Sequence, residues 1–336
     1  MPFYQYTVAI CMITYNHSKF ITQAIEGVLM QKTNFSYHLY IGEDCSTDNT
    51  RQICLEYKKK YPDLITLLLP EKNLGVIKNC EQTLQACEGK YIAFCEGDDY
   101  WTDSYKLQKQ VDLMESNSEY GLCYTDVDFL YQESGDIRKA VFKNGVIPKT
   151  LNFEEHLVKK RFLAPCTWLF RREFVDIFDL EGYTDASFAM LLDVFQNSKV
   201  YFLDEVTTVY RVSDGSASRP KDEKKRYYYE KGIFEVQKNY ISKYNVDEKI
   251  SRLVYSDAYF RLMKDAMSFD DQDFVSEGKA FFCELGLSVN SLFSFYNETI
   301  KREQKLHVIR TSKLYRMVSF FIKPSFLLKN KLKKNT

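Results

Sequence analysis

The sequence predicts the α/β fold class, with a largely parallel sheet wound by helices and a helical appendage at the C-terminal end. Three observations support this prediction. Strand and helix patterns alternate through the first third of the chain, polar residues gather after each predicted strand, and strand patterns stop after Pro220. Strands separated by helices favour parallel neighbours joined by right-handed crossovers. The 336 residues, 45% of them hydrophobic, can bury a large core.

The first four strands and helices follow from the spacing of apolar residues. Apolar, β-branched runs predict strands at 8–14, 37–43, 65–69 and 91–95. Helical spacing and capping residues predict helices at 21–31, 48–61, 76–86 and 103–117. The candidate N-caps are Ser46, Thr47 or Asp48 for the second helix and Thr102 or Asp103 for the fourth.

Each of these strands is followed by a polar cluster. The clusters are "TYNH" (14–17), "EDCSTDNT" (43–50), "EKNLG" (71–75) and "EGDDYW" (96–101). In open α/β sheets the ligand lies outside the carboxyl ends of the strands, so the clusters should form one site. Carboxylates gathered at one edge repel each other unless a cation lies among them. Hard oxygen ligands suit Mg²⁺ or Mn²⁺, which in turn bind phosphates. For the acid pair alone, a helix cap or a solvated turn is the alternative.

Several classes of protein are disfavoured by what the sequence lacks. Neither GxGxxG nor GxxxxGK[ST] occurs, which argues against a dinucleotide site and a P-loop. The nine cysteines are scattered singly, as expected of reduced core thiols. The N-terminus has no signal-peptide pattern and no stretch is long enough to span a membrane, so we expect a cytoplasmic protein. The formal net charge is zero, and we expect no nucleic acid partner.

Four stretches, taken in order, resemble a known family. They are "VAICMITYNHSKFITQAIEGVLMQ", "YIGEDCSTDNT", "YPDLITLLLPEKNLG" and "GKYIAFCEGDDYWTDSYKLQKQ". In this order and spacing they resemble the family 2 inverting glycosyltransferases, over roughly residues 5–215. The resemblance implies a GT-A-like fold with a Rossmann-like mixed sheet. It also implies transfer of a sugar from a nucleotide-diphosphate donor, with a UDP-sugar favoured, to a saccharide or lipid-linked acceptor. The setting would be cell-surface polysaccharide biosynthesis, with Mn²⁺ or Mg²⁺ as the divalent cation.

The same resemblance assigns the nucleotide pocket. It implies that Thr14, Tyr15 and Asp44 hold the base and ribose, and Asp44 as an ionised carboxylate can accept from a uracil N–H. The alternative for Asp44 is a loop acid that caps the next helix. Asn73 and Gly75 match a stretch that lines the pocket, although Gly75 could also serve only as a turn former.

The family's DxD motif falls on "EGDD". Asp98 and Asp99 match the acids that face the ribose and the divalent ion, and we take Asp99 as the preferred metal ligand. Glu96 stands where many relatives have the first Asp. Relatives often carry Tyr-Arg-x-His further on, whereas this chain has Ser213 at the His position. Ser213, Asp214 or water could supply the missing ligand, or the metal site is weakened.

The resemblance also implies an acceptor side. Arg211 could neutralise the diphosphate, with a structural ion pair as the alternative. We expect the base that deprotonates the acceptor to be Asp185, with Thr184 or Asp185 beginning a helix. Asp193, two turns further along, is expected to be a solvated or salt-bridged acid. Trp168 could stack on a sugar, or could belong to the core.

The predicted domain boundary lies near residue 218. Residues 1–218 should form the transferase domain, with a nucleotide-sugar half (1–128) and an acceptor half (129–218), and 219–336 a helical region. The segment 315–336 mixes lysines with Phe and Leu and has no acids, so it could bind an anionic membrane surface or be a solvated tail. The alternative function is a non-catalytic nucleotide-sugar-binding or scaffold protein that keeps the fold. A nucleotidyltransferase is a weaker option.

Overall fold

A nine-stranded mixed sheet organises the described part of the chain. The computed structural model describes residues 4–146, 152–178, 180, 182–213 and 220–286. The strands are β1 (Tyr6–Thr14), β2 (Tyr37–Glu43), β3 (Ile65–Leu68), β4 (Gly89–Phe94), β5 (Tyr100–Trp101), β6 (Tyr120–Tyr131), β7 (Ile137–Arg138), β8 (Trp168–Arg171) and β9 (Lys199–Val212). All four predicted strands are present, each within two residues of its predicted ends.

The helices follow the predicted alternation in the first half. They are α1 (Ile21–Leu29), α2 (Thr50–Lys60), α3 (Val76–Ala86), α4 (Lys106–Ser116), α5 (Phe153–Lys159), α6 (Ala186–Asn197), α7 (Glu223–Lys243), α8 (Glu248–Ser268) and α9 (Gln272–Glu284). A short π-helix (Phe142–Val146) and two 3₁₀ helices (Pro165–Thr167 and Arg172–Ile177) lie in the loops of the second half. α2 and α4 start two or three residues later than predicted, after Asn49 and Tyr105.

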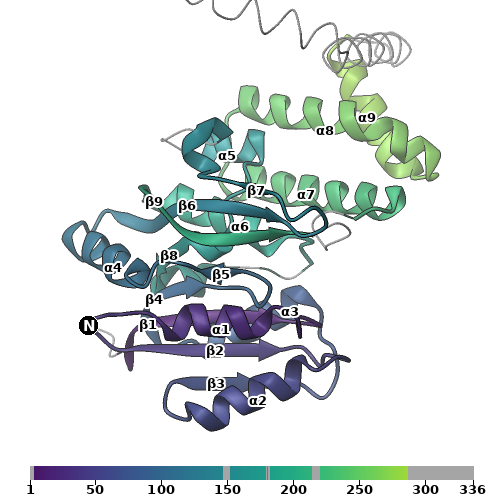
Figure 1. Ribbon diagram of the computed structural model, residues 1–336. Coiled ribbons are helices and arrows are strands. Elements are labelled where there is room, and N and C mark those ends of the chain that lie inside the picture. Colours follow the sequence, from purple (N-terminus) through teal and green to yellow (C-terminus); the bar gives the residue numbers. More distant parts are fainter. Residues whose placement is uncertain (1–3, 147–151, 179, 181, 214–219, 287–336) are drawn as a thin grey trace, which may run out of the picture. The chain divides into compact units, whose positions relative to one another are not determined.

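The strand order explains where a ligand site can form. The order is β3-β2-β1-β4-β8-β6-β9-β5, with β7 paired to β6. β1 pairs in parallel with both β2 and β4, and β8 then joins β4 in the antiparallel sense. The chain runs outward from β1 to β3 and returns to the other side of β1 for β4 (Figure 1). This reversal between β1 and β4 creates the crevice at which α/β sheets bind ligands.

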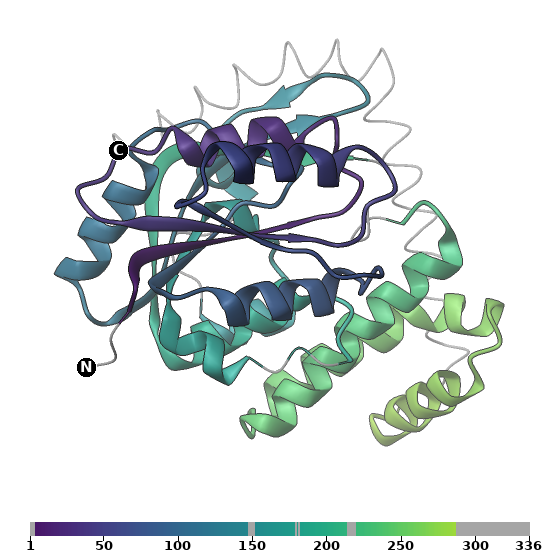
Figure 2. The ribbon, with the colours of Figure 1, turned by 90° about the horizontal axis from the view of Figure 1, so that it is seen from below.

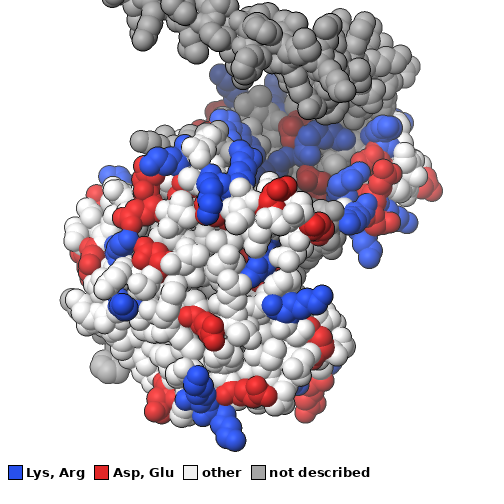
Figure 3. All heavy atoms as spheres, in the orientation of Figure 1, with Lys and Arg blue, Asp and Glu red and all other residues white. Residues whose placement is uncertain are grey.

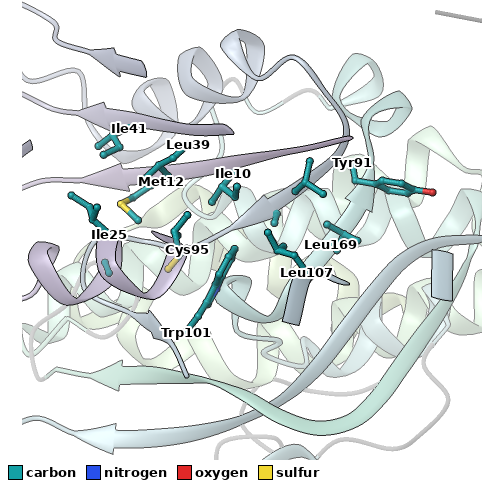
Figure 4. Packing of buried hydrophobic residues seen from close by; sticks show 14 of the residues in the cluster. Ile10, Met12, Ile25, Leu39, Ile41, Tyr91, Cys95, Trp101, Leu107 and Leu169 are labelled. Carbon is teal, nitrogen blue, oxygen red and sulfur yellow. The ribbon is translucent and has the colours of Figure 1, made fainter. Parts of the chain in front are cut away.

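The core lies between the sheet and the helices of the first half. Figure 4 shows Ile10, Met12, Leu39 and Ile41 from the central strands beside Ile25 of α1. Trp101 and Leu107 extend the same cluster, and all seven residues are at most 2% exposed. α1 and α2 cover one face of the sheet and α3 covers the other (Figure 2). Apolar burial on both faces is why the parallel strands read as continuous hydrophobic runs.

The chain divides into two compact units, Met1–Ala258 and Tyr259–Thr336. The first unit therefore includes α7, which lies beyond the boundary expected near residue 218. In the second unit, Tyr259 packs on Phe274 and Phe282 of α9. On the face drawn in Figure 3, the described residues carry positive and negative side chains interspersed. Among the described residues, no helix is both long enough and apolar enough to cross a membrane. The segment 315–336 lies outside the described residues.

Candidate active site

The turn after β1 is tied to the loop after β2. Asn16 adopts a left-handed conformation with φ 56°, which Asn tolerates better than most residues. Its backbone N–H donates to Ser46 Oγ at 2.9 Å, and its side-chain Oδ1 accepts from the Thr47 N–H at 2.8 Å. Thr14 is 2% exposed, whereas Tyr15 is 41% exposed. Of Thr14 and Tyr15, which were expected to hold the base and ribose together with Asp44, Tyr15 is therefore the one that presents its side chain to solvent.

Asp44 joins the ends of β2 and β3. Its carboxylate accepts from the backbone N–H groups of Leu74 (2.7 Å) and Gly75 (3.0 Å), while Asn73 Nδ2 donates to the Asp44 carbonyl at 3.0 Å. Gly75 has φ +85°, a conformation that L side chains rarely adopt. The structure therefore brings Asp44, Asn73 and Gly75 together as expected. In this arrangement the Asp44 carboxylate holds the Asn-Leu-Gly turn.

The "EGDD" segment follows β4 directly beside the end of β1. The Gly97 N–H donates to the Ile13 carbonyl at 3.0 Å. A Cβ on Gly97 would lie 2.4 Å from Thr14 Oγ1, so only glycine permits this close approach. Asp98 is 35% exposed on its side chain, with Oδ2 3.9 Å from His17 Nε2. Asp99 is 1% exposed, and its Oδ1 accepts from the Arg211 backbone N–H at 2.8 Å. The solvent-facing acid of the pair is Asp98, while Asp99 anchors β9.

The carboxylates of this edge influence one another. Burial raises the pKa of Glu96 to about 8, with smaller contributions from the charges of Asp98 and Asp185. Burial and the charges of Asp98 and Glu96 also raise the pKa of Asp99 well above its usual value. Like charges gathered in a partly buried edge favour a bound cation, because the cation offsets their repulsion.

These residues fit a divalent cation that is shared with a ligand. Asp99 Oδ2 is buried without a hydrogen-bond partner, and the nearby Cys166 thiol is only a weak donor. No three His, Cys, Asp or Glu side chains among the described residues are grouped closely enough to hold an ion. Mg²⁺ commonly binds one or two carboxylates and takes its other ligands from phosphates and water. The acids of this edge therefore provide a partial site for a divalent cation.

Arg211 places a buried positive group near the same edge. Its guanidinium lies 4.8 Å from the Phe20 ring centroid and 4.7 Å from that of Tyr100, and Nη2 donates to Gln23. The Nε atom is buried without a partner. No described carboxylate lies within ion-pair distance of this guanidinium, so the structural ion pair considered from sequence is not present among the described residues. A buried guanidinium of this kind is suited to an anionic ligand.

Asp185 and Asp193 have different surroundings on α6. Asp185 is the N-cap of the helix, as expected, and its Oδ1 accepts from the Phe188 N–H at 3.0 Å. Asp193 is fully buried and accepts from Tyr240 (2.5 Å), Lys243 (2.7 Å) and Tyr244 (2.7 Å). The expectation of a salt-bridged Asp193 is confirmed. Of these two acids, only Asp185 has a charge that contributes to the raised pKa of Glu96 at the acidic edge.

Trp168 lies in the core, and Ser213 lies just after β9. Trp168 is 1% exposed and packs edge-on against Phe94 at 5.8 Å between ring centroids. The expectation that it stacks on a sugar was wrong, because the ring is packed in the core and almost none of its surface is left for a ligand. Ser213 follows β9 and is half-buried, whereas Asp214 lies outside the described residues.

Sequence reasoning did not select several residues that the fold brings to this site. His17 Nε2 lies 3.9 Å from Asp98 Oδ2, and the absence of a side chain at Gly97 leaves room for Thr14. The rings of Phe20 and Tyr100 lie against the Arg211 guanidinium. Tyr229 of α7 donates to Asp185 Oδ2 at 2.5 Å. The glycine inside "EGDD" was a signal for close approach. The contact of Tyr229 had no local signal, because it joins residues 44 positions apart.

Comparison with known sequences identifies the family. The model of Glycosyl transferase family 2 matches residues 9–178, which is just over half of the chain. The chain belongs to glycosyl transferase family 2. The match covers β1 to β8 and includes the edge built from Thr14, Asp44 and the "EGDD" segment, but it ends before Asp185.

Three curated relatives of this family 2 chain show how far the similarity extends. An uncharacterized protein of Mycobacterium tuberculosis is 40% identical over 126 residues, which is 38% of this chain and only 36% of that relative. The putative teichuronic acid biosynthesis glycosyltransferase TuaG of Bacillus subtilis is 26% identical, over 64% of this chain and 82% of TuaG. The Escherichia coli protein WfgD is 26% identical, over 64% of this chain and 81% of WfgD. WfgD is named as a UDP-Glc:alpha-D-GlcNAc-diphosphoundecaprenol beta-1,3-glucosyltransferase.

Solved structures show the fold of this family 2 chain. Staphylococcus aureus TarS, in complex with UDP-GlcNAc, superposes with a TM-score of 0.59 at 16% identity, over 82% of this chain and 80% of that one. A mannosyltransferase of Pyrobaculum calidifontis, in complex with GDP-Man and Mn²⁺, gives 0.53 at 14% identity, over 94% of this chain and 84% of that one. The mixed sheet and its helices therefore form the GT-A fold, which confirms the predicted fold class.

Proposed function

We propose that this protein transfers a sugar from a nucleoside-diphosphate donor, with a UDP-sugar preferred, to a hydroxyl group of an acceptor with inversion. One observation carries the proposal. Asp98 is partly exposed beside His17 of the turn after β1, and Oδ2 of the buried Asp99 has no hydrogen-bond partner, so this edge presents acids that a divalent cation and a diphosphate can use. Asp185, whose charge contributes to the raised pKa of Glu96, is the candidate base for the same edge. A donor-binding edge and a base near it are the parts that inverting transfer needs.

The donor would lie across the crevice between β1 and β4. Tyr15, together with the turn held by Asp44, would border the base and ribose. Asp98 would hold a divalent cation, with Asp99 and Glu96 beside it. When bound, Mn²⁺ or Mg²⁺ would neutralise charge on the diphosphate and help it to leave. The exposed position of Asp98 favours it as the direct ligand over Asp99, the residue preferred from sequence.

The reaction is a single displacement in this proposal. The acceptor hydroxyl oxygen attacks the anomeric carbon opposite the diphosphate, and its proton passes to Asp185. A new C–O bond to the acceptor forms as the C–O bond to the diphosphate breaks. The electron pair of the broken bond leaves with the nucleoside diphosphate. Because attack and departure occur on opposite faces, the anomeric configuration inverts.

The names of relatives suggest the acceptor class. TuaG is named for teichuronic acid biosynthesis, and WfgD for transfer to a sugar on a diphosphoundecaprenol lipid. We therefore infer a saccharide or lipid-linked acceptor in cell-surface polysaccharide synthesis. The acid-free sequence of residues 315–336 supports work at the cytoplasmic face of the membrane, where an anionic surface attracts lysines.

Ser213 favours a second candidate, a nucleotide-sugar-binding protein without turnover. It stands where many family members carry a histidine, so the metal site could hold a donor without activating it. The two candidates differ at Asp185. A pure binding protein has no need of a base, so Asp185→Asn would leave its affinity for nucleotide-sugars unchanged and there would be no turnover to lose.

The experiment is a thermal-shift panel of UDP-glucose, UDP-GlcNAc, GDP-mannose and dTDP-rhamnose with and without Mn²⁺, followed by assays of nucleotide release. A ligand that binds only the folded state raises its stability by RT ln(1 + [L]/Kd), so the correct donor should raise the melting temperature. We expect Asp185→Asn to keep this shift while transfer falls by roughly 10²–10⁴. Full turnover in Asp185→Asn, or no shift with any donor, would contradict the proposal.

A further inference from the structure

The carboxylate of Asp185 is held by donors from two helices. Its Oδ1 accepts from the Phe188 N–H (3.0 Å) and from Ser187 Oγ (2.5 Å), both in the first turn of α6. Its Oδ2 accepts from the hydroxyl of Tyr229 at 2.5 Å. Tyr229 lies in α7, beyond the residues that the family model matches.

These contacts leave one part of the carboxylate open. An ionised carboxylate offers about four acceptor positions, two on each oxygen. Oδ1 uses both of its positions on α6, whereas Oδ2 uses one on Tyr229 and keeps the other. A proton from an acceptor hydroxyl would therefore be taken at Oδ2, beside the hydroxyl of Tyr229.

The Tyr229 hydroxyl is suited to a lasting donor role. Burial and the charge of Asp185 raise the pKa of Tyr229 above its usual value, so the hydroxyl keeps its proton at any physiological pH. A charge-assisted O–H···O⁻ bond is among the stronger hydrogen bonds in proteins. The bond therefore restrains the orientation of Oδ2, which the N-cap contacts on Oδ1 alone leave free to tilt.

The packing of α7 on the start of α6 sets the position of this bond. Gly232, one turn after Tyr229, faces Thr184, and a Cβ at Gly232 would lie 2.3 Å from Thr184 Oγ1 and 2.4 Å from Cγ2. A real Cβ cannot approach so closely, so a larger residue at 232 would push the two helices apart. Gly232 thus allows the approach that brings Tyr229 to Asp185.

We propose that α7 is part of the transferase site and that Tyr229 is a positioning residue, which aims Oδ2 of Asp185 at the acceptor hydroxyl. The inference rests on the proposed function, in which Asp185 is the base. It gives α7, which lies beyond the residues that the family model matches, a part in the site.

The first test is Tyr229→Phe in the full chain, with Tyr228→Phe as the matched control. Tyr228 is the neighbouring residue on the same helix and is 45% exposed. The assay follows release of the nucleoside diphosphate from the donor that the panel selects, with a GlcNAc-diphospho-alkyl acceptor. We expect kcat of Tyr229→Phe to fall about 10-fold, as loss of one hydrogen bond to a charged group predicts, with donor KM unchanged. Tyr228→Phe should retain wild-type kcat.

The second test separates positioning from folding. Gly232→Ala should lower kcat by a similar factor, because the new methyl group meets Thr184 and moves α7 away from Asp185. Alanine is the better helix former, so this change should not weaken α7 itself. Thr184→Ala removes the two closest atoms and leaves only its Cβ, 2.9 Å from the new methyl group, so the double variant Gly232→Ala/Thr184→Ala should recover part of the lost kcat.

The outcomes distinguish this inference from the proposed function. A wild-type protein that releases no nucleotide from any donor would refute the proposed function, and the inference with it. An active wild type with Asp185→Asn inactive and Tyr229→Phe at full kcat would refute only the inference. A Tyr229→Phe variant that loses donor affinity and kcat together would also refute it, since positioning of the base acts on kcat.

Discussion

At the scale of single residues, exposure separates two neighbouring acids that the sequence presents as a pair. Asp98 is 35% exposed on its side chain, whereas Asp99 is 1% exposed and accepts the Arg211 backbone N–H. Successive residues that leave a strand point in different directions, so one acid can face the ligand while the next holds the sheet together. The pairing of an exposed acid with a buried one is what the "EGDD" segment contributes to the site.

This difference leads to a prediction about metal binding. Asp98→Asn should weaken Mn²⁺-dependent binding of the donor nucleotide by about 10-fold or more, because it removes a formal charge from a cation site. Asp99→Asn should keep an acceptor for the Arg211 N–H and change the affinity less. Isothermal titration with UDP at several Mn²⁺ concentrations measures both. The reverse order of effects would restore Asp99 as the direct ligand, as first expected from sequence.

At the scale of elements, two acids of α6 have different roles in our proposal, Asp185 as the base and Asp193 as a link to α7. Asp185 caps the helix at its N-terminus, where the backbone N–H groups are unpaired. Asp193 lies two turns later and ties α6 to α7 through Tyr240, Lys243 and Tyr244. The contacts at these two acids help to hold α7 in the place that the proposed site requires.

Asp193→Asn should therefore act on stability. The change removes the buried negative charge that three hydrogen-bond donors share. We expect it to lower the free energy of unfolding by about 2–3 kcal/mol. This is less than the loss of a fully buried ion pair would cost, because Lys243 is partly exposed. Urea unfolding followed by circular dichroism measures it. Unchanged stability together with abolished transfer would move the base from Asp185 to Asp193.

At the scale of the whole molecule, the C-terminal sequence bears on where the protein works. After Glu303 the chain has no acidic residue, and 315–336 interleaves lysines with Phe and Leu. Deleting 317–336 should abolish co-sedimentation with phosphatidylglycerol-containing vesicles, because each basic residue near an anionic surface contributes about 1 kcal/mol. Turnover on a soluble acceptor should remain. Vesicles of phosphatidylcholine alone are the control, and equal sedimentation of both proteins would disprove the membrane role.

Much of the first half could be predicted because its signals are local. Apolar runs located β1 to β4 within two residues, and the polar clusters after them do meet at one edge, since parallel strands align their carboxyl ends. Helix starts were less accurate. Asp48 accepts from the Thr50 N–H at 2.9 Å, yet Asn49 is the cap, because several residues in that loop could serve.

The second half depended on pairings that local patterns do not encode. β6 and β9 form a long parallel pair, and β8 inserts between β4 and β6 in the antiparallel sense. That insertion buries Trp168, which the sequence alone left open as either a platform or a core residue. The pairing of β5 with β9 brings Arg211 to the acidic edge in the same way.

By itself the sequence determined the fold class, the family resemblance and the grouping of acids at strand ends, because hydrophobic period and motif spacing are properties of neighbouring residues. Only the tertiary structure decided which acid is exposed, which aromatic is core and which helix reaches the candidate base. Those properties depend on contacts between residues far apart in the chain, such as Asp185 and Tyr229. The geometry of such contacts is set by the packing of whole helices and strands, whose small shifts decide whether two side chains can meet.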